Sequence, residues 1–416
     1  MTTRTLVVLV ASAILLVVLG GCAAEDRAAA GQTDATTSPR NGRVGPVRPV
    51  VGPVGPTTPV GPGPGHPLQR VDRDAGVSAR LRDGSVVWFF GDSGERNPDD
   101  SLAWFEIGSA AWAPADEPTI TRDVVVAGRA VPFASPTPAF PACPPEAPVA
   151  GMWPAAAVTV PDGRVDQVLV WMANICLGSG RVAVSRGMSI GRWTYDPSAP
   201  PTVEPIRVTV LEQRLFPDDS LGEAAADGDD GFVYTMGCAA PGRPGWATEY
   251  GPCRVARVRP DRAADRTAYE VWTGEDWRAG GTAAAVTLGG PGPTAPPGPV
   301  SIERRDDGTW VMLYTPWPGY VGTATFRTAT RPQGPWSAPV DVPLPGCDDV
   351  YRAMPQTCYA VNLQPALDDD TGGDNDRSAG TGATLAFGYY DRLVSQPPLR
   401  GAFLVTRVPF SVDPDG

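Results

Sequence analysis

The chain has 416 residues, of which 34 are basic and 46 acidic, with one histidine and a formal net charge of −12. This charge argues against nucleic acid or an anionic lipid surface as the main partner. All 34 basic residues are arginine, which together with 48 glycines and 48 prolines is typical of a GC-rich genome such as that of an actinobacterium.

The first 22 residues have the order of an export signal. Arg4 precedes an apolar run from Leu6 to Leu19, and small residues then lead to Cys22. The run L-G-G-C at 19–22 resembles the lipobox of bacterial lipoproteins, in which cleavage before the cysteine is accompanied by lipidation of its sulfur. Residues 1–21 are therefore predicted to be a lipoprotein signal peptide, with Cys22 lipidated and the protein extracytoplasmic on the cell membrane. The alternative is an uncleaved transmembrane anchor, although the run is short against the ~20 residues of a bilayer span.

Residues 22–65 are rich in Ala, Thr, Gly and Pro, and the tripeptide Val-Gly-Pro recurs in them. Such a composition cannot bury a core, and its prolines favour extended polyproline II at about 3.1 Å per residue. We expect a disordered tether over 22–65 and a single folded domain over 66–416.

Six further cysteines follow in that domain, and an even number in an exported chain predicts disulfides. Six cysteines allow 15 connectivities, and their spacing favours bonds between sequence neighbours. A metal site is the alternative, but the chain has no Cys-x-x-Cys and only His66. No metal and no cofactor are predicted. The expected pairs are Cys143 with Cys176, Cys238 with Cys253, and Cys347 with Cys358.

Five turn signals are each followed by a short apolar strand. The first, Asp83-Gly84, precedes V-V-W-F-F at 86–90, and the later turn glycines are at 163, 231, 308 and 382. Intervals of about 70 residues leave room for four strands each, and long helical periodicity is absent. We therefore predict an all-β fold, a five-bladed β-propeller, with a double sandwich as the alternative. Further strands are expected at 206–210, 253–258, 269–272 and 402–405.

The first hairpin also carries a family resemblance. The pieces R-D-A-G-V-S at 73–78, L-R-D-G at 81–84 and W-F-F-G-D-S at 88–93 resemble the first blade of secreted proteins called domain of unknown function 4185. Some of these form glycoside hydrolase family 183, the endo-D-arabinanases. R-T-A-T-R-P-Q-G-P-W-S at 327–337 is similar to a strand-turn common to five-bladed glycosidase propellers. The resemblance covers most of 67–413 through scattered motifs.

The resemblance implies a D-arabinan substrate and a functional pair at Asp74 and Asp92. Family members usually read Gly-Asp-Thr where this chain has Gly91-Asp92-Ser93. Glycosidic cleavage needs two carboxyl groups across the bond. A hairpin through the 83–84 turn would place these two on opposite strands, where one carboxyl raises the proton affinity of the other. The alternative is that Asp92 caps a turn and Asp74 lies on the surface.

Other polar and aromatic residues are candidates for substrate contacts, each with a structural alternative. Glu106 is a reserve acid, and the acidic loop 368–376 lacks the spacing of an EF-hand calcium site. Trp171 and Trp310 share the alternative that applies to most propeller tryptophans, packing between blades. The residues predicted to bind substrate are Trp153, Asn174, Trp317, Tyr320, Tyr390 and Asp391.

Two functions remain open on the sequence. The first is a lipid-anchored, monomeric envelope hydrolase that cleaves a furanosidic cell-wall glycan such as D-arabinan. The second is a non-catalytic propeller that binds envelope glycan or protein. Two carboxyl groups facing each other in an open pocket favour the enzyme, whereas an axis filled by apolar side chains favours the binding module.

Overall fold

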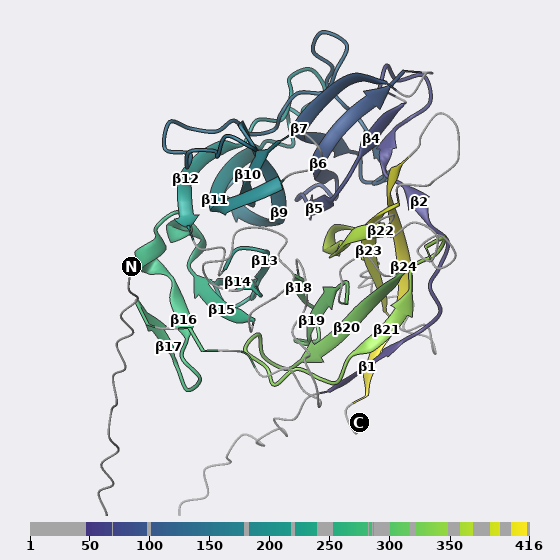
Figure 1. The fold of residues 1–416 in the computed structure, drawn as a ribbon. Coiled ribbons are helices and arrows are strands. Elements are labelled where there is room, and N and C mark those ends of the chain that lie inside the picture. The colour runs from purple at the N-terminus through teal and green to yellow at the C-terminus, as the bar shows by residue number, and fades with distance from the viewer. Residues whose placement is uncertain are drawn as a thin grey trace, which may run out of the picture. The chain divides into compact units, whose positions relative to one another are not determined.

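The protein is described from a computed structural model, in which five antiparallel sheets follow one another along the chain (Figure 1). Cys22, the signal sequence and residues up to 46 lie outside the described residues, as do Trp317 and Tyr320. The structure describes residues 47–68, 70–97, 101–178, 183–217, 221–238, 253–281, 283–284, 286, 300–316, 322–347, 358–368, 383–391 and 401–413.

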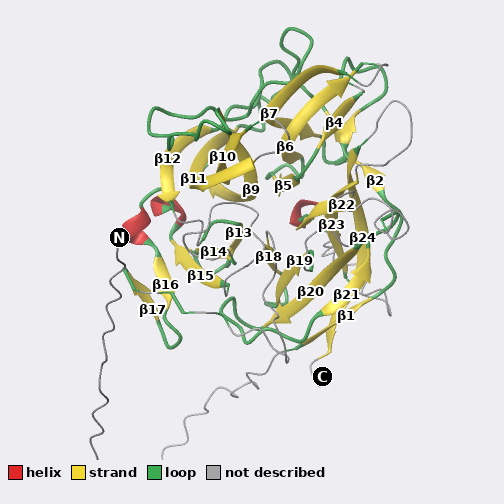
Figure 2. Ribbon diagram, viewed as in Figure 1, coloured by secondary structure: helices red, strands yellow, loops and turns green. Residues whose placement is uncertain are grey.

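Strands account for most of the described chain (Figure 2). Its helices are the 3-10 turns η2 (Pro260–Arg262), η3 (Arg266–Ala268) and η4 (Pro365–Leu367), none of which is long enough to cross a membrane. The prediction of an all-β fold is confirmed.

The first two blades carry the long strands. Blade 1 consists of β4 (Val71–Arg73), β5 (Gly76–Arg80), β6 (Val86–Arg96) and β7 (Leu102–Ala113). Blade 2 consists of β9 (Val149–Asp162), β10 (Val165–Leu177), β11 (Ala183–Tyr195) and β12 (Thr209–Phe216).

The remaining blades are shorter. Blade 3 holds β13 (Ala224–Asp227), β14 (Val233–Gly237), β15 (Arg254–Val258), β16 (Glu270–Trp272) and β17 (Trp277–Ala279). Blade 4 holds β18 (Val300–Arg304), β19 (Trp310–Tyr314), β20 (Thr323–Ala329) and β21 (Val340–Pro343). Blade 5 holds β22 (Cys358–Leu363), β23 (Thr384–Asp391), β24 (Ala402–Asp413) and, from the other end of the described chain, β1 (Arg48–Val51).

The blades close into a ring. The innermost strands of the five blades contact one another in order around the ring. Their order is β5, β9, β13, β18 and β22, and β22 contacts β5 again. Buried apolar side chains form a separate cluster between each pair of neighbouring blades, so the core is divided among the five blade junctions. Trp171 and Trp310 belong to these clusters and are fully or nearly fully buried. Both tryptophans therefore pack between blades, which was the alternative to a substrate contact. The prediction of a five-bladed propeller is confirmed.

The predicted turns connect the first and second long strands of their blades. Gly84, Gly163, Gly231 and Gly308 all have positive φ, between 58° and 85°, which glycine adopts without steric cost. The fifth turn glycine, Gly382, lies outside the described residues. The strand expected at 206–210 differs from the structure, because β12 begins at Thr209 and Val208 instead donates its N–H to the carbonyl of Phe133.

The domain begins earlier than expected, because residues 47–62 pack on three blades. The carbonyl of Val47 accepts a hydrogen bond from Thr328 of blade 4, and β1 pairs with β24 along the outer edge of blade 5. β2 (Thr58–Pro59) also pairs with β24, and β3 (Gly61–Pro62) pairs with β8 (Ile120–Thr121) beside blade 1. Proline is tolerated at such an edge because one side of the strand needs no donor. The expected boundary at residue 66 is therefore wrong for this segment.

The three disulfides join the pairs that the spacing favours: Cys143 with Cys176, Cys238 with Cys253, and Cys347 with Cys358. The second closes the connection between β14 and β15, and the third joins the end of blade 4 to the start of blade 5. Each bond restricts the conformations open to the unfolded chain and so stabilises the folded state.

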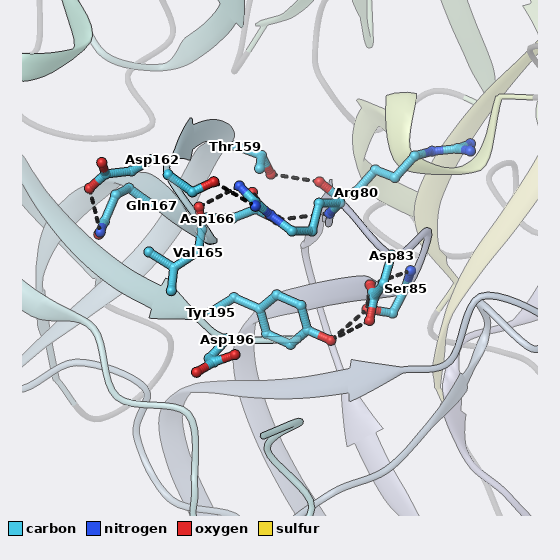
Figure 3. A network of polar contacts seen from close by, with 12 residues as sticks. Arg80, Asp83, Ser85, Thr159, Asp162, Val165, Asp166, Gln167, Tyr195 and Asp196 are labelled. Carbon is cyan, nitrogen blue, oxygen red and sulfur yellow. Dashed lines mark hydrogen bonds and ion pairs between the residues drawn. The ribbon is translucent and has the colours of Figure 1, made fainter. Parts of the chain in front are cut away.

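Polar contacts fasten the first hairpin to blade 2 at its turn (Figure 3). The hydroxyl of Tyr195 on β11 donates to Asp83 at 2.5 Å, and Asp83 also accepts from Ser85. Arg82 binds the buried carboxylate of Asp166 through its Nε at 2.8 Å and its backbone N–H at 2.7 Å. These contacts hold the turn of the hairpin, at the end opposite to Asp74 and Asp92, against blade 2.

Candidate active site

The first hairpin brings Asp74 and Asp92 opposite one another. β5 pairs with the first half of β6, and β4 pairs with its second half in the same register, as Gly76↔Phe90 and Arg73↔Ser93 show. Asp74 lies in the gap between β4 and β5, and its N–H donates to the carbonyl of Asp92 at 3.0 Å. The expected cross-strand placement of these two residues is confirmed.

A kink after Asp74 turns its carboxylate back onto the hairpin. Ala75 has a φ of 44°, and the N–H of Gly91 is shared between the carbonyls of Asp74 and Ala75 at 2.9 Å each. Because of this kink, the N–H of Asp92 binds the side-chain Oδ1 of Asp74 at 2.8 Å instead of its carbonyl. A Cβ at position 91 would lie 2.4 Å from that oxygen, so any side chain there would displace the Asp74 carboxylate from the N–H of Asp92.

Neighbouring blades supply one donor to each carboxyl group. Tyr359 on β22 donates its hydroxyl to Oδ2 of Asp74 at 2.8 Å. Trp153 on β9 donates its indole Nε1–H to Oδ1 of Asp92 at 2.7 Å. Trp153, predicted to bind substrate, is thus a hydrogen-bond donor to Asp92. Asp74 has donors on both of its oxygens, one of them the N–H of Asp92.

The two carboxyl groups have different proton affinities. Burial raises the pKa of Asp92 to about 8, and the neighbouring charge of Asp74 adds to this, against the lowering effect of Trp153. Burial raises the pKa of Asp74 to about 6; hydrogen bonds from Tyr359 and the backbone of Asp92 lower it, and the charge of Asp72 raises it. At neutral pH the pair therefore holds one proton, on Asp92, and one negative charge, on Asp74.

A hollow of about 90 Å³ opens beside the pair, at the junction of blades 1 and 5. Tyr390 of β23, a predicted substrate contact, donates its hydroxyl to Oδ1 of Asp72 at 2.8 Å within this lining. The residues that line the hollow are Asp72, Asp74, Asp92, Ser93, Gly94, Leu102, Phe105 and Tyr390.

Two other predicted contacts are not among these lining residues. Asn174 is fully buried inside blade 2, where it donates to the carbonyl of Gln213 at 2.8 Å and accepts from its amide at 2.7 Å. Asp391 ends β23 and is buried between its strand partners Ala402 and Cys358. Both positions fit structural roles in their sheets.

The reserve acid Glu106 lies on β7 opposite Ser93, and burial raises its pKa. Glu106 is not part of the described lining of the pocket. His66 contacts the carbonyl of Asp123 through Nε2 at 3.0 Å, away from the carboxyl pair. In the described part of the chain, no three His, Cys, Asp or Glu side chains are grouped to hold a metal ion.

Several residues of the site were not predicted from the sequence, among them Tyr359, Asp72, Leu102 and Phe105. Tyr359 comes from blade 5, and no motif in the sequence connects it with Asp74. Asp72 could have been found, because it stands two residues before Asp74 and alternate residues of a strand share a face. The other two, Leu102 and Phe105, are exposed apolar residues of β7.

The sequence model of one family, described as a domain of unknown function (DUF4185), matches residues 72–376. Notoamide biosynthesis cluster protein J' of Aspergillus versicolor is 35% identical over 118 residues, which are 27% of this chain and 27% of that protein. Its counterpart from Aspergillus sp. (strain MF297-2) is 32% identical over the same share. The chain spans about a quarter of the length of these curated relatives.

Solved structures with a similar chain course include a putative hydrolase from Bacteroides ovatus ATCC 8483. It has a TM-score of 0.54 and 14% identity, over 81% of this chain and 85% of that one. A family 117 glycoside hydrolase from Zobellia galactanivorans has a TM-score of 0.44 and 13% identity, over 88% and 91% of the two chains. The first of these likenesses shows a shared fold.

Proposed function

The chain belongs to the DUF4185 family, and we propose that it is a glycoside hydrolase in which Asp92 is the acid and Asp74 the base or nucleophile. The observation that carries this proposal is the pair itself. Two carboxyl groups from opposite strands of one hairpin line one hollow, and their surroundings push their pKa values apart to about 8 and about 6. Such a separation is how one residue type supplies both an acid and a base.

The neighbours of each carboxyl group suit its role. Asp92 keeps its proton at neutral pH and can give it to the oxygen of the leaving sugar. The carboxylate left behind is stabilised by the indole N–H of Trp153. Asp74 stays ionised because Tyr359 and the N–H of Asp92 donate to its two oxygens, so it can attack the sugar or activate water.

The substrate we propose is a neutral furanosidic glycan of the cell envelope, such as D-arabinan. Support comes from the resemblance of the first-blade motifs to the endo-D-arabinanases and from a pocket lined by Asp72, Asp74 and Asp92. Neutral sugars do not suffer the repulsion that the charges of Asp72 and Asp74 would impose on an anionic polymer.

We further propose that the protein is a monomeric lipoprotein, lipidated at Cys22 outside the cytoplasm. The apolar leader and the L-G-G-C run support this, as do three disulfides, which persist in oxidising compartments. Residues 22–46, if fully extended, would place the propeller up to ~80 Å from the lipid. Mass spectrometry of the protein extracted from membranes should show a chain that begins at Cys22 and carries a lipid, whereas a mass that includes residues 1–21 would argue for an uncleaved anchor.

The hydrolase is tested by incubating the chain without its signal peptide and lipidated cysteine, residues 23–416, with mycobacterial-type arabinogalactan and, separately, with xylan. Mass spectrometry of the soluble products would show arabinose oligosaccharides from the first polymer only. The Asp92→Asn variant should release none. If the folded wild-type protein releases nothing from either polymer but binds one of them, the propeller is a glycan-binding module instead.

A further inference from the structure

Two large apolar side chains are exposed at the edge of the pocket. Phe105 and Leu102 on β7 are 43% and 54% exposed, and both line the hollow that holds the carboxyl pair. Single exposed apolar residues are common on protein surfaces. Two that share one concave site with acid–base groups form an apolar wall, and such a wall is a usual part of a ligand site.

The strand register places Phe105 on the same face as Asp92. β6 and β7 pair as Asp92↔Ile107 and Gly94↔Phe105. Paired residues share a face, and so do alternate residues of one strand, so Phe105 stands about 7 Å further along the sheet from Asp92. This is about the span of one sugar ring.

Gly94 keeps the space between Asp92 and Phe105 open. A Cβ at this position would lie 3.0 Å from the carbonyl oxygen of Trp104 and 3.8 Å from Cδ2 of Leu102. Any side chain there would enter the gap beside Leu102. The apolar wall is therefore accessible from the carboxyl pair.

The charged side of the pocket restricts what can bind. Asp72, Asp74 and Asp92 line it, and its described lining holds no basic residue. Arg73, between two of these acids in sequence, is buried and paired with Asp123. An anionic sugar would meet repulsion that no cation of the described lining offsets, whereas a neutral sugar presents hydroxyls to the acids and an apolar ring face to the wall.

We propose that Phe105 and Leu102, above Gly94 and beside Asp92, form a subsite for a neutral sugar residue. The orientation of this subsite rests on the proposed function: because Asp92 protonates the leaving oxygen, the sugar on Phe105 belongs to the leaving group. Because this subsite is at the open edge of the pocket, a longer leaving chain can extend beyond it.

Binding measurements test the subsite without turnover. Calorimetry would compare neutral arabinan oligosaccharides on the Asp92→Asn protein and on the same protein carrying Phe105→Ala or Leu102→Ala. Removing the ring of Phe105 should weaken binding about tenfold, since ~1.4 kcal/mol of apolar contact corresponds to that factor. Leu211→Ala is the matched control, because Leu211 is 37% exposed on β12 and does not belong to the described pocket lining, and it should leave binding unchanged.

Several results would overturn the subsite. Unchanged binding in the Phe105→Ala protein would do so, as would the absence of any binding of neutral oligosaccharides to the Asp92→Asn protein. Equal binding of galacturonan oligosaccharides would overturn its restriction to neutral sugars. Thermal denaturation of each variant shows whether it is folded, and both side chains are exposed enough for their removal to leave the core intact.

The failure of the subsite and that of the hydrolase can be told apart. If the wild type cleaves arabinan and Phe105→Ala keeps its kcat/KM and product lengths, the subsite is wrong and the hydrolase stands. If no glycan is cleaved but oligosaccharide binding depends on Phe105, the hydrolase is wrong and the sugar site stands. If the wild type cleaves arabinan and the folded Phe105→Ala protein has a lower kcat/KM, both the hydrolase and the subsite stand.

Discussion

Tyr359 decides the pH at which Asp74 can act as a base. Its hydroxyl donates to Oδ2 of Asp74 at 2.8 Å and lowers the pKa of that carboxyl, which burial holds at about 6. Tyr359→Phe removes this donor but keeps the ring, which packs against Tyr390 with centroids 5.0 Å apart. The change is therefore directed at the proton affinity of Asp74, with the packing between the blades retained.

The expected shift follows from the energy of that hydrogen bond. A hydrogen bond to a charged group contributes about 1.5–3 kcal/mol, and ~1.4 kcal/mol corresponds to one pKa unit. The pKa of Asp74 should thus rise by about one to two units, and the fraction of ionised Asp74 at pH 6 should fall about 5- to 50-fold.

The assay is the pH profile of kcat/KM on a soluble glycan substrate, which reports the ionisations of the free enzyme. In Tyr359→Phe the acidic limb should move upward and the optimum should narrow towards the pKa of Asp92. Tyr389→Phe is the matched control, since this hydroxyl of the same blade donates to the carbonyl of Pro345, and its profile should match the wild type. An unmoved acidic limb in Tyr359→Phe would refute the role of Asp74 as the ionised partner.

Three further predictions concern stability. Burial raises the pKa of Asp92 from 3.8 to about 8, so between these pH values the native state binds more protons than the unfolded chain and loses stability as pH rises. The gain in melting temperature from Asp92→Asn should therefore be larger at pH 8 than at pH 5. An equal gain at both pH values would contradict the raised pKa. Replacing Cys238 and Cys253 together by alanine opens a disulfide between residues 15 apart in sequence, and should lower the free energy of unfolding by about 3 kcal/mol in a urea titration. An unchanged urea midpoint would contradict this prediction. Deleting residues 1–62 should lower the melting temperature clearly below that of a chain lacking only residues 1–44, because only the longer deletion removes the strands paired with β24.

The hairpin geometry of the site was predictable because it depends on local signals. Asp74 and Asp92 are equidistant from Asp83, the centre of the hairpin loop, and equal spacing from that centre means cross-strand pairing. The kink at Ala75 was not predictable, since alanine has no preference for positive φ. That kink aims the Asp74 carboxylate at the N–H of Asp92.

Contacts between distant blades escaped prediction. Tyr359 is 285 residues from Asp74, and its place beside that carboxylate follows from closure of the ring. Asn174 was predicted to bind substrate because the apolar run ends at Met172, which suggested a strand end. In the structure β10 continues to Leu177, and the Asn174 amide is buried inside blade 2. Proline content hid the strands of residues 47–62, because a sequence pattern does not reveal an edge position where the missing N–H costs little.

The central claim is that Asp74 and Asp92 together cleave a glycosidic bond. The measurement that tests it most directly is the release of oligosaccharides from arabinogalactan by the folded mature chain, beside its Asp74→Asn, Asp92→Asn and Asp391→Asn forms. We expect products from the wild type and from Asp391→Asn, and at least a 1000-fold loss, by about 4 kcal/mol of lost transition-state stabilisation, in each of the other two. Undiminished release by either the Asp74→Asn or the Asp92→Asn protein would contradict the claim.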